Sequence, residues 1–463
     1  MTATIQTETN AYHKSTTQIQ RLAWVIVLVS FALFCSISIA LTGGVYFFFF
    51  RSTVPLSVDV QVGRGSAGIV AASEQLFPRS GSLSTPLSDR PATLSTDTLS
   101  QATITFEAAS EIDNIPIVIG TLTLKNGSFI TLENARQPRF AWSDGAYIIE
   151  FDDFIGQAEL FITATLDRPL SLQIKTAQGN ATYVFDTIGR YSIIADQSFV
   201  RVTTYEGRAL LVSPDNRNSR FAITGERATL LTGTNLPVVT SAPIDLLENG
   251  RFAFAITTNE ETAQLQMPQQ WGCFNYSENV PSGQWRADTW QGRFSVRLIR
   301  ETGSTTSRTG CSFLVEALVT DYTYLELEAT ISLNFQNLVN CGIVGSECPM
   351  MIFVDYVDTQ GIERNWYQSF FYEYDPQNPA PLVCQTCAQA YEHRQIAKEV
   401  WYTFESGNLI SRLPEDQRPA IISEVRFYAS GHQYDVFLSE IALFAGTEQV
   451  DVPSDRIPNN DND

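Results

Sequence analysis

Six cysteines are the residues whose type and spacing most directly suggest chemistry. They are Cys273, Cys311, Cys341, Cys348, Cys384 and Cys387. An even number of thiols in one region of a chain, in an oxidising compartment, predicts up to three disulfides, although six thiols allow 15 pairings. We expect the local pairing, which joins Cys341 to Cys348 and Cys384 to Cys387 and leaves Cys273 for Cys311. The alternative is a zinc site in which the C-x6-C and C-x2-C spacings supply four thiolates.

Aromatic side chains in the same region suggest a second chemistry, the binding of sugars. An aromatic face stacks against the apolar C–H surface of a pyranose, while nearby amides and carboxylates bind its hydroxyl groups. We expect at least half of these rings to be buried, because Trp in a β-sandwich usually packs in the core. The segment W-R-A-D-T-W-Q-G is the best exposed candidate, since it lies between turn signals. The candidate platforms are Trp285, Trp290, Trp366, Tyr367, Trp401 and Tyr402.

Residues for catalysis are sparse. The chain has three histidines, His13, His393 and His432, and neither a G-x-S-x-G nor an H-E-x-x-H motif. Neighbouring acids such as Asp152 and Asp153 could serve glycoside hydrolysis, but adjacent residues of a strand point to opposite faces. We therefore predict no catalytic residue and no enzyme. No metal ligand set is predicted, although a structural calcium ion is compatible with a jelly-roll fold.

A long apolar segment precedes all of these residues. Residues 22–50 contain no charged side chain, and 29 residues of helix exceed the ~30 Å hydrocarbon core of a bilayer. Lys14 and Arg21 precede the segment, so the positive-inside rule predicts a short cytoplasmic tail at 1–21 and an exterior remainder. The alternative is a cleaved signal peptide, which the length of the run and the lack of a cleavage pattern disfavour. We predict a single-pass membrane protein.

The charge of the chain limits its partners. Its formal net charge is −20. Nucleic acid and anionic lipid surfaces attract proteins through a basic field, so this composition argues against both as ligands of the whole chain.

The sequence predicts two all-β regions in the exterior part. Between residues 52 and 248, short β-branched runs alternate with turn residues, and helix-length amphipathic stretches are absent. A Ser/Thr/Pro-rich stretch at 76–100 predicts a long irregular connection. Residues 252–449 form a second β-rich region with more aromatics and longer loops, and its seven or eight strand candidates fit a jelly-roll sandwich. The polar tail at 450–463 is predicted to be disordered.

The first β region resembles a FecR-type domain over about residues 56–235. In that family a T-x-G-x-[YF] element starts a strand, an R-V-T-V-x-E-G hairpin follows and a G-E-x-A turn closes the repeat. The resemblance implies an extracytoplasmic β-solenoid or sandwich, often in envelope sensing, without catalytic residues. Only about 21 residues precede the membrane, which argues against regulation of a cytoplasmic sigma factor. The matching positions are Thr187, Gly189, Tyr191, Val202, Thr203, Glu206, Gly207, Gly225, Glu226 and Ala228.

The second β region ends in a pattern that resembles the last hairpin of galactose-binding-like and carbohydrate-binding jelly rolls. The pattern runs from Ser430, Gly431 and His432 through Tyr434–Val436 to Leu443. Together these features predict a non-enzymatic, membrane-anchored protein of the bacterial cell envelope whose distal sandwich recognises glycan or another envelope polymer. The alternative is a structural or regulatory envelope subunit that binds a protein partner through its FecR-like domain.

Overall fold

The computed structural model describes residues 9–71, 74–82, 84–87, 90–108, 117–140, 142–163, 166, 168–179, 181–252, 270–277, 279–377, 382–387, 389 and 391–447. The predicted tail at 450–463 lies outside these residues. The chain divides into two compact units. One consists of residues 1–55 and 136–147, and the other of residues 56–135 and 148–463.

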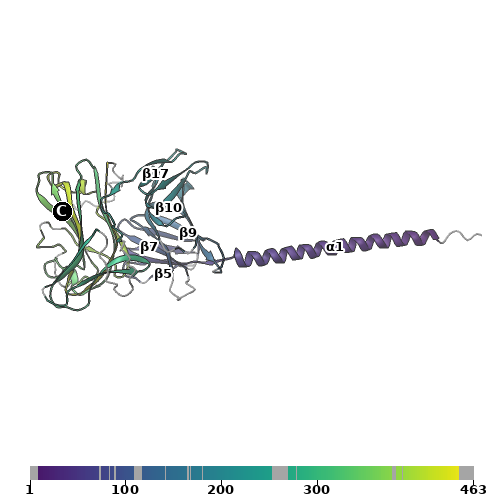
Figure 1. The fold of residues 1–463 in the computed structure, drawn as a ribbon, viewed down its shortest axis with the longest axis horizontal. Coiled ribbons are helices and arrows are strands. Elements are labelled where there is room, and N and C mark those ends of the chain that lie inside the picture. The colour runs from purple at the N-terminus through teal and green to yellow at the C-terminus, as the bar shows by residue number, and fades with distance from the viewer. Residues whose placement is uncertain are drawn as a thin grey trace, which may run out of the picture. The chain divides into compact units, whose positions relative to one another are not determined.

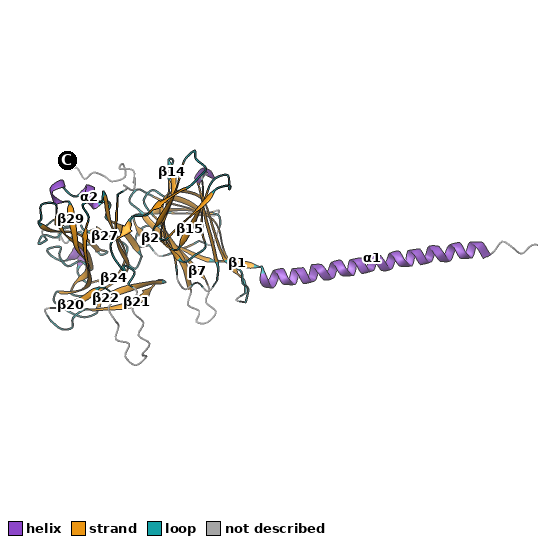
Figure 2. Ribbon diagram, turned by 45° about the horizontal axis from the view of Figure 1, so that its top comes forward, coloured by secondary structure: helices purple, strands orange, loops and turns teal. Residues whose placement is uncertain are grey.

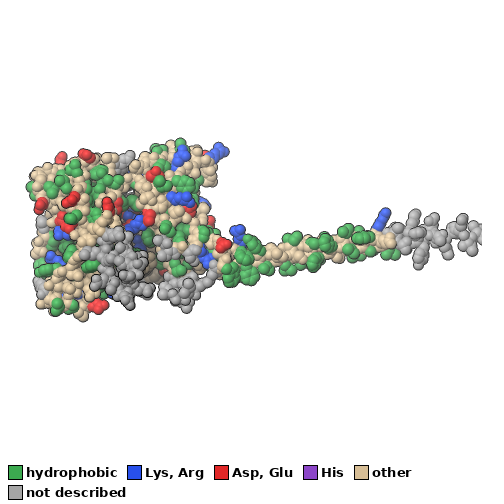
Figure 3. All heavy atoms as spheres, viewed as in Figure 1, with side chains coloured by type: hydrophobic (Ala, Val, Ile, Leu, Met, Phe, Trp, Pro, Cys, Tyr) green, Lys and Arg blue, Asp and Glu red, His purple; other side chains and the backbone are tan. Residues whose placement is uncertain are grey.

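Helix α1 (Thr9–Phe50) dominates the first unit (Figure 1). Residues 19–50 of this helix are long and apolar enough to cross a membrane or to act as a signal sequence. The helix begins before the predicted span, so residues 9–21 of the expected tail are helical. Figure 3 shows hydrophobic side chains along the coloured part of the helix, with a Lys or Arg side chain at each end of this apolar stretch. Strand β1 (Thr53–Pro55) follows the helix and pairs antiparallel with residues 136–138.

The β domain, residues 56–135 and 148–241, is built from antiparallel strands that form a closed β-structure. One run of paired strands follows the order β5-β2-β7-β8-β10-β13-β14-β17-β18. Two shorter runs are β4-β3-β6-β9 and β11-β12-β15-β16. The strands are β2 (Ser57–Arg64), β3 (Ala67–Ala71), β4 (Glu74–Leu76), β5 (Thr85–Pro86), β6 (Ala92–Thr96), β7 (Gln101–Ala108), β8 (Ile117–Leu124), β9 (Phe129–Pro138), β10 (Tyr147–Ile162), β11 (Leu170–Thr176), β12 (Thr182–Phe185), β13 (Gly189–Ala195), β14 (Phe199–Glu206), β15 (Arg208–Val212), β16 (Ser219–Ile223), β17 (Glu226–Leu231) and β18 (Val238–Ser241).

The FecR-like motif residues have structural roles in this domain. Thr187 Oγ1 lies 2.9 Å from the hydroxyl of Tyr191, and the same hydroxyl accepts a hydrogen bond from the backbone N–H of Arg208. Gly207 has a φ of 90°, and a Cβ atom there would lie 2.3 Å from the Tyr191 hydroxyl oxygen. The motif therefore builds a tight turn between β14 and β15. Glycine suits position 207 of this turn because it adopts positive φ without steric cost.

The Ser/Thr/Pro-rich stretch at 76–100 is not one long irregular connection, which corrects the sequence prediction. Strand β6 lies within it and pairs with both β3 and β9. Ala92 and Leu94 on one face of β6 are buried. The alternation of apolar residues with the β-branched Thr93 suits a strand, and the flanking Pro and Ser residues masked this short signal.

The sandwich, residues 244–446, consists of two packed sheets (Figure 2). The first has the order β21-β22-β30-β24-β28, with β19 paired to β30, and the second has the order β20-β23-β29-β25-β26-β27. The all-β prediction with an N-terminal helix is confirmed, but β19 places the start of the sandwich before residue 252. The strands are β19 (Ile244–Asp245), β20 (Gly272–Ser277), β21 (Gln284–Trp290), β22 (Arg293–Arg300), β23 (Ser307–Leu318), β24 (Tyr324–Gln336), β25 (Met350–Asp358), β26 (Glu363–Phe371), β27 (Arg394–Gln395), β28 (Tyr402–Glu405), β29 (Pro419–Gly431) and β30 (Tyr434–Gly446). The described part of the sandwich also has a short α-helix, α2 (Leu409–Arg412), and two 3-10 helices, η2 (Val339–Cys341) and η3 (Glu415–Gln417).

Candidate functional site

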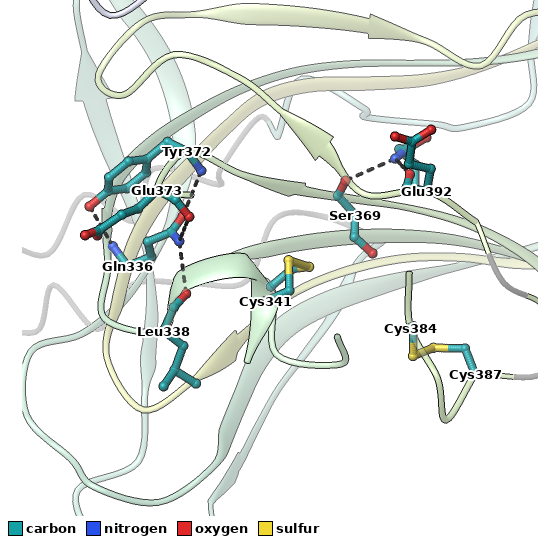
Figure 4. The surroundings of a disulfide bond; sticks show 11 residues. Gln336, Leu338, Cys341, Ser369, Tyr372, Glu373, Cys384, Cys387 and Glu392 are labelled. Atoms are coloured by element: carbon teal, nitrogen blue, oxygen red, sulfur yellow. Dashed lines mark hydrogen bonds between the residues drawn. A yellow bond between two sulfur atoms is a disulfide. The ribbon is translucent and has the colours of Figure 1, made fainter. Parts of the chain in front are cut away.

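The three disulfides of the sandwich follow the local pairing. Cys273 is bonded to Cys311 across the paired strands β20 and β23. Cys341 is bonded to Cys348, and Cys384 to Cys387. Figure 4 shows the surroundings of these two bonds, where Gln336 Nε2 donates a hydrogen bond to the carbonyl of Leu338 at 3.0 Å. The sulfurs are thus bonded to one another, which leaves no thiolates for the alternative zinc site.

Four of the six rings proposed as sugar platforms lie in the interior. Trp366, Tyr367, Trp401 and Tyr402 are each at most 4% exposed. The Trp366 ring stacks on Phe404 in the main core of the sandwich, with 6.2 Å between centroids. Tyr367 points to the other face of β26, where it packs in a second cluster with the disulfide-bonded cysteines.

Strand β26 is therefore buried on both faces, because the loops that carry the disulfides cover its outer side. Trp366 and Tyr367 therefore offer no open ring face to a ligand, while Trp401 and Tyr402, which lie outside β26, are each only 4% exposed. The prediction that these four rings could bind a ligand is wrong because they are buried. A sequence pattern cannot show that loops cover the second face of a strand.

The remaining two rings are half-buried and do not form a groove with the others. Trp290 stacks on Phe437, with 5.4 Å between ring centroids. Trp285 packs against the main core. The indole N–H of Trp401 donates a hydrogen bond to the carbonyl of Trp290 at 3.3 Å, so the two residues support each other structurally. The segment W-R-A-D-T-W-Q-G forms strand β21 and does not present an open aromatic surface.

Charged side chains gather instead where the β domain meets the sandwich. We call this set the junction network. Three of its members come from the β domain and three from sandwich strands β24, β28 and β30. All except Glu405 are at most 7% exposed, and Figure 3 shows acidic and basic side chains around a hollow in this part of the molecule. The members are Lys125, Glu159, Arg190, Glu328, Glu405 and Glu440.

Two cations hold the junction network together. The ammonium of Lys125 lies 2.7 Å from Glu159 Oε1 and also contacts Glu405. The guanidinium of Arg190 lies 3.1 Å from Glu440 Oε1 and 3.5 Å from Glu159 Oε1, and it also contacts Glu328. Each cation therefore bridges the β domain and the sandwich.

The network shifts the pKa values of its carboxyl groups in opposite directions. Burial raises the pKa of Glu159, but the charges of Lys125 and Arg190 outweigh this effect and lower the pKa to about 2. Burial and the negative charge of Glu159 raise the pKa of Glu328 well above its usual value. Desolvation disfavours every buried charge, and at Glu159 the two close cations outweigh it.

Carboxylate oxygens of Glu159, Glu328 and Glu405 lie close enough together to hold a metal ion. The Lys125 ammonium already contacts two of these groups, which makes it the internal counter-ion of the cluster. A second group of potential metal ligands consists of His393, Cys341 and Cys348, which lie close together, but the two cysteine sulfurs form a disulfide. Burial lowers the pKa of His393 to about 4, and the imidazole is therefore neutral at physiological pH.

Neutral contacts also join the β domain to the sandwich. The side chain of Gln101 makes two hydrogen bonds of 2.9 Å with the backbone of Thr403, one to its carbonyl and one from its N–H. The ring of Tyr205 stacks on Phe444, with 4.6 Å between centroids. The two regions are thus fixed to each other by paired groups that solvent does not reach.

A cavity of about 180 Å³, which we call the junction cavity, lies beside this network. Phe161, Ile188 and Gly189 line it from the β domain, and Arg293, Phe294 and Ser439 line it from the sandwich. The ion pair of Arg251 and Glu206, in which each side chain is 41% exposed, also lines the cavity. A smaller cavity of about 80 Å³ is lined by polar groups that include Arg64, Lys125 and Arg394.

Arg293 is the most unusual residue of the junction cavity. It is 6% exposed, and its guanidinium lies over the ring of Phe161 at 4.7 Å. Nη2 donates a hydrogen bond to Thr121 Oγ1 at 2.6 Å, whereas Nε has no hydrogen-bond partner within the described part of the chain. Burial lowers the pKa of this guanidinium. Such a donor suits an acceptor supplied by a ligand.

The sequence analysis missed the junction network and its cavity. One signal was present in the acidic residues of Y-L-E-L-E-A-T-I-S-L, where Glu326 and Glu328 interrupt an apolar strand. Charges at such positions are either solvated or paired in the interior. Arg190, the partner of Glu328, is 138 residues away in the sequence, so the sequence alone could not identify this ion pair.

Comparison with known proteins gives only distant likenesses. No protein-family model matches the chain, and no curated protein matches it. A solved structure assigned as an anti-sigma factor from Parabacteroides distasonis is 14% identical, with a TM-score of 0.20 over 30% of this chain and 55% of that chain. This chain thus spans about half the length of that protein.

Two carbohydrate-binding modules are similar at the same level. The family 11 module from Clostridium thermocellum is 12% identical, with a TM-score of 0.23 over 39% of this chain and 92% of that chain. The xylan-binding domain from Paenibacillus barcinonensis is 12% identical, with a TM-score of 0.24 over 45% of this chain and 99% of that chain. At these scores the likenesses do not indicate what this chain binds.

Proposed function

We propose that this chain is a membrane-anchored, extracytoplasmic binding protein, without enzymatic activity, whose junction cavity binds one sugar residue of an envelope glycan. The observation that carries the proposal is the buried Arg293 Nε, a donor without a partner among the described residues, in a cavity lined by two phenylalanine rings. The site differs from the aromatic groove that the sequence suggested, but the ligand class is the same.

The chemistry of the cavity suits a pyranose. Phe294 is 44% exposed and offers an apolar surface to the C–H groups of a sugar. Arg251, Glu206 and Ser439 supply donors and acceptors for hydroxyl groups nearby. The volume is small beside the ~300–1,000 Å³ of sites for drug-sized ligands, so it suits a single residue or the end of a chain.

The long apolar helix supports the location. A span with basic residues at its inner end would place residues 51–463 outside the membrane. Three disulfides support the same orientation, because they persist in oxidising compartments. A glycan of the cell envelope would then be within reach of the cavity.

Glycan-array screening of the full chain in nanodiscs, followed by calorimetry, tests this proposal. We expect Arg293→Met to weaken binding about 10-fold or more, since a hydrogen bond to a charged group contributes about 1.5–3 kcal/mol. Phe294→Ala should also weaken binding, and it keeps the buried charge intact. The matched control is Arg286→Met, which removes a 40% exposed arginine of the same hairpin. Absence of glycan binding, or equal affinity for all four proteins, would refute the proposal.

A second candidate function, the binding of a protein partner through the β domain, is favoured by exposed apolar side chains on strand β16. Phe221 and Ile223 on β16 are 52% and 54% exposed. Exposed apolar side chains that lie together on a protein surface mark interaction sites. A protein partner should then co-purify with the chain from membranes. Loss of this partner in Phe221→Asp, but not in Arg220→Asp on the same strand, would support this candidate.

A further inference from the structure

Hydrogen bonds join the C-terminal end of helix α1 to the other segment of the same compact unit, residues 136–147. Strand β1 pairs with residues 136–138. The backbone N–H of Arg139 donates a hydrogen bond to the carbonyl of Ser52 at 3.0 Å, and the hydroxyl of Ser143 donates one to the carbonyl of Phe50 at 2.9 Å. The segment is therefore fixed directly beside the last turn of the helix.

Aromatic rings from the helix and from this segment form one cluster. The ring of Phe140 stacks on Trp142, with 4.7 Å between centroids and 11° between planes. Phe140 also lies 5.6 Å from Phe48 and 5.4 Å from Phe49. The guanidinium of Arg139 lies over the Phe48 ring at 5.3 Å. We call these five residues the aromatic collar.

The aromatic collar leaves much of its ring surface uncovered. Trp142 is 59% exposed, and Phe48 and Phe49 are 46% and 39% exposed. Phe48 and Phe49 belong to the apolar residues 19–50, and the Trp142 ring, 6.5 Å from that of Phe49, adds to this apolar surface beyond the helix. Large contiguous apolar surfaces of this kind mark interaction sites.

The composition of the collar matches one environment in particular. Trp side chains concentrate at the membrane–water interface, where an apolar ring and a polar N–H both find partners. Arginine extends its charged end from that depth toward phosphate groups, and Arg139 and Arg51 both lie at this end of the helix. The net negative charge of the chain disfavours binding to anionic lipids, but aromatic rings enter the interface of an uncharged bilayer equally well. The acidity is therefore compatible with contact between the collar and a membrane.

We propose that Arg139, Phe140 and Trp142 lie in the headgroup region of the bilayer on the exterior side, as a second membrane contact beside the helix. This inference rests on the membrane anchor of the proposed function. The occupant of the collar is a phospholipid bilayer, and the contact fixes the depth at which α1 leaves it.

The test uses the full chain in zwitterionic vesicles, with an environment-sensitive fluorophore on Trp142→Cys in a Cys35→Ser background. The other six cysteines form disulfides and do not react. We expect blue-shifted emission that nitroxides on the headgroup quench more strongly than nitroxides midway along the acyl chain. A matched label at Val29→Cys should show the reverse preference.

Each outcome decides the proposal. If the label at residue 29 is quenched and the one at residue 142 is not, the collar proposal is wrong while the anchor stands. If neither is quenched, the anchor itself is wrong and the collar proposal falls with it. Because the cysteine variant alters the collar, the unlabelled chain is compared with Trp142→Phe in brominated-lipid vesicles. The Trp142 contribution should be quenched, and the absence of a difference would overturn the proposal.

Discussion

The interior of the sandwich and its junction with the β domain are both buried, but opposite kinds of side chain build them. The interior packs rings such as Trp366, Phe370 and Phe404 against each other. The junction instead buries Lys125 and Arg190 among carboxyl groups from both regions. An apolar interior tolerates changes of pH and salt, whereas buried ion pairs depend on every partner being present. The comparison shows that packed rings hold the sandwich together, whereas paired charges fix the sandwich to the β domain beside the junction cavity.

The largest expected effect is at the junction. Arg190→Met removes the cation between Glu159, Glu328 and Glu440, so the free energy of unfolding should fall by about 3–5 kcal/mol. Urea denaturation of the full chain measures this, with the exposed Arg220→Met as the control. A loss below about 1 kcal/mol would show that the network contributes little to the junction.

In the sandwich interior, Trp366→Ala should lower the free energy of unfolding by about 3 kcal/mol, the lower end of the range for buried Trp. Its neighbour Tyr391 is half-buried and can relax into part of the space. Trp285→Ala, at a half-buried position, should cost less. Thermal denaturation measures both variants. If Trp366→Ala and Trp285→Ala lowered the stability equally, the distinction between the buried core and the half-buried edge of the sandwich would be wrong.

Replacing Cys341 and Cys348 by Ser tests the covalent part of the sandwich. The two residues are separated by 7 positions, and the chain-entropy model gives about 2 kcal/mol for so short a loop. The double variant should unfold at a lower urea concentration and leave glycan affinity unchanged, because the disulfide does not line the junction cavity. Lost affinity in a folded variant would instead place the ligand near these loops.

The smallest expected effect is a change in pH dependence. Burial and the neighbouring Glu405 raise the pKa of Glu326 to about 7. A carboxyl group that holds its proton more tightly in the folded chain favours folding at low pH, and this contribution is lost as the pH rises through about 7. The stability should therefore fall between about pH 4.5 and 7.

Glu326→Gln should reduce this slope without abolishing it, because burial also raises the pKa of Asp245 to about 6. Urea denaturation at a series of pH values measures the slope. An unchanged slope in the variant would mean that Glu326 does not titrate as described.

The fold was largely predictable, and the site was not. Alternating β-branched runs predicted both all-β regions, and the close spacing of four cysteines indicated their pairing. Both signals are local in sequence. The roles of Trp366 and Tyr367 were not predictable, because burial of the second face of β26 depends on distant loops. Nor could the contact of Lys125 with Glu405 be foreseen, since 280 residues separate them.

Photo-crosslinking tests the central claim, that both β regions contribute to one sugar site, most directly. The full chain is irradiated with a glycan that it binds and that carries a diazirine, and the adducts are located by mass spectrometry. The account predicts adducts on residues of both regions that line the junction cavity, such as Ile188 in the β domain and Phe294 in the sandwich. Adducts confined to one region, or located away from this cavity, would contradict it.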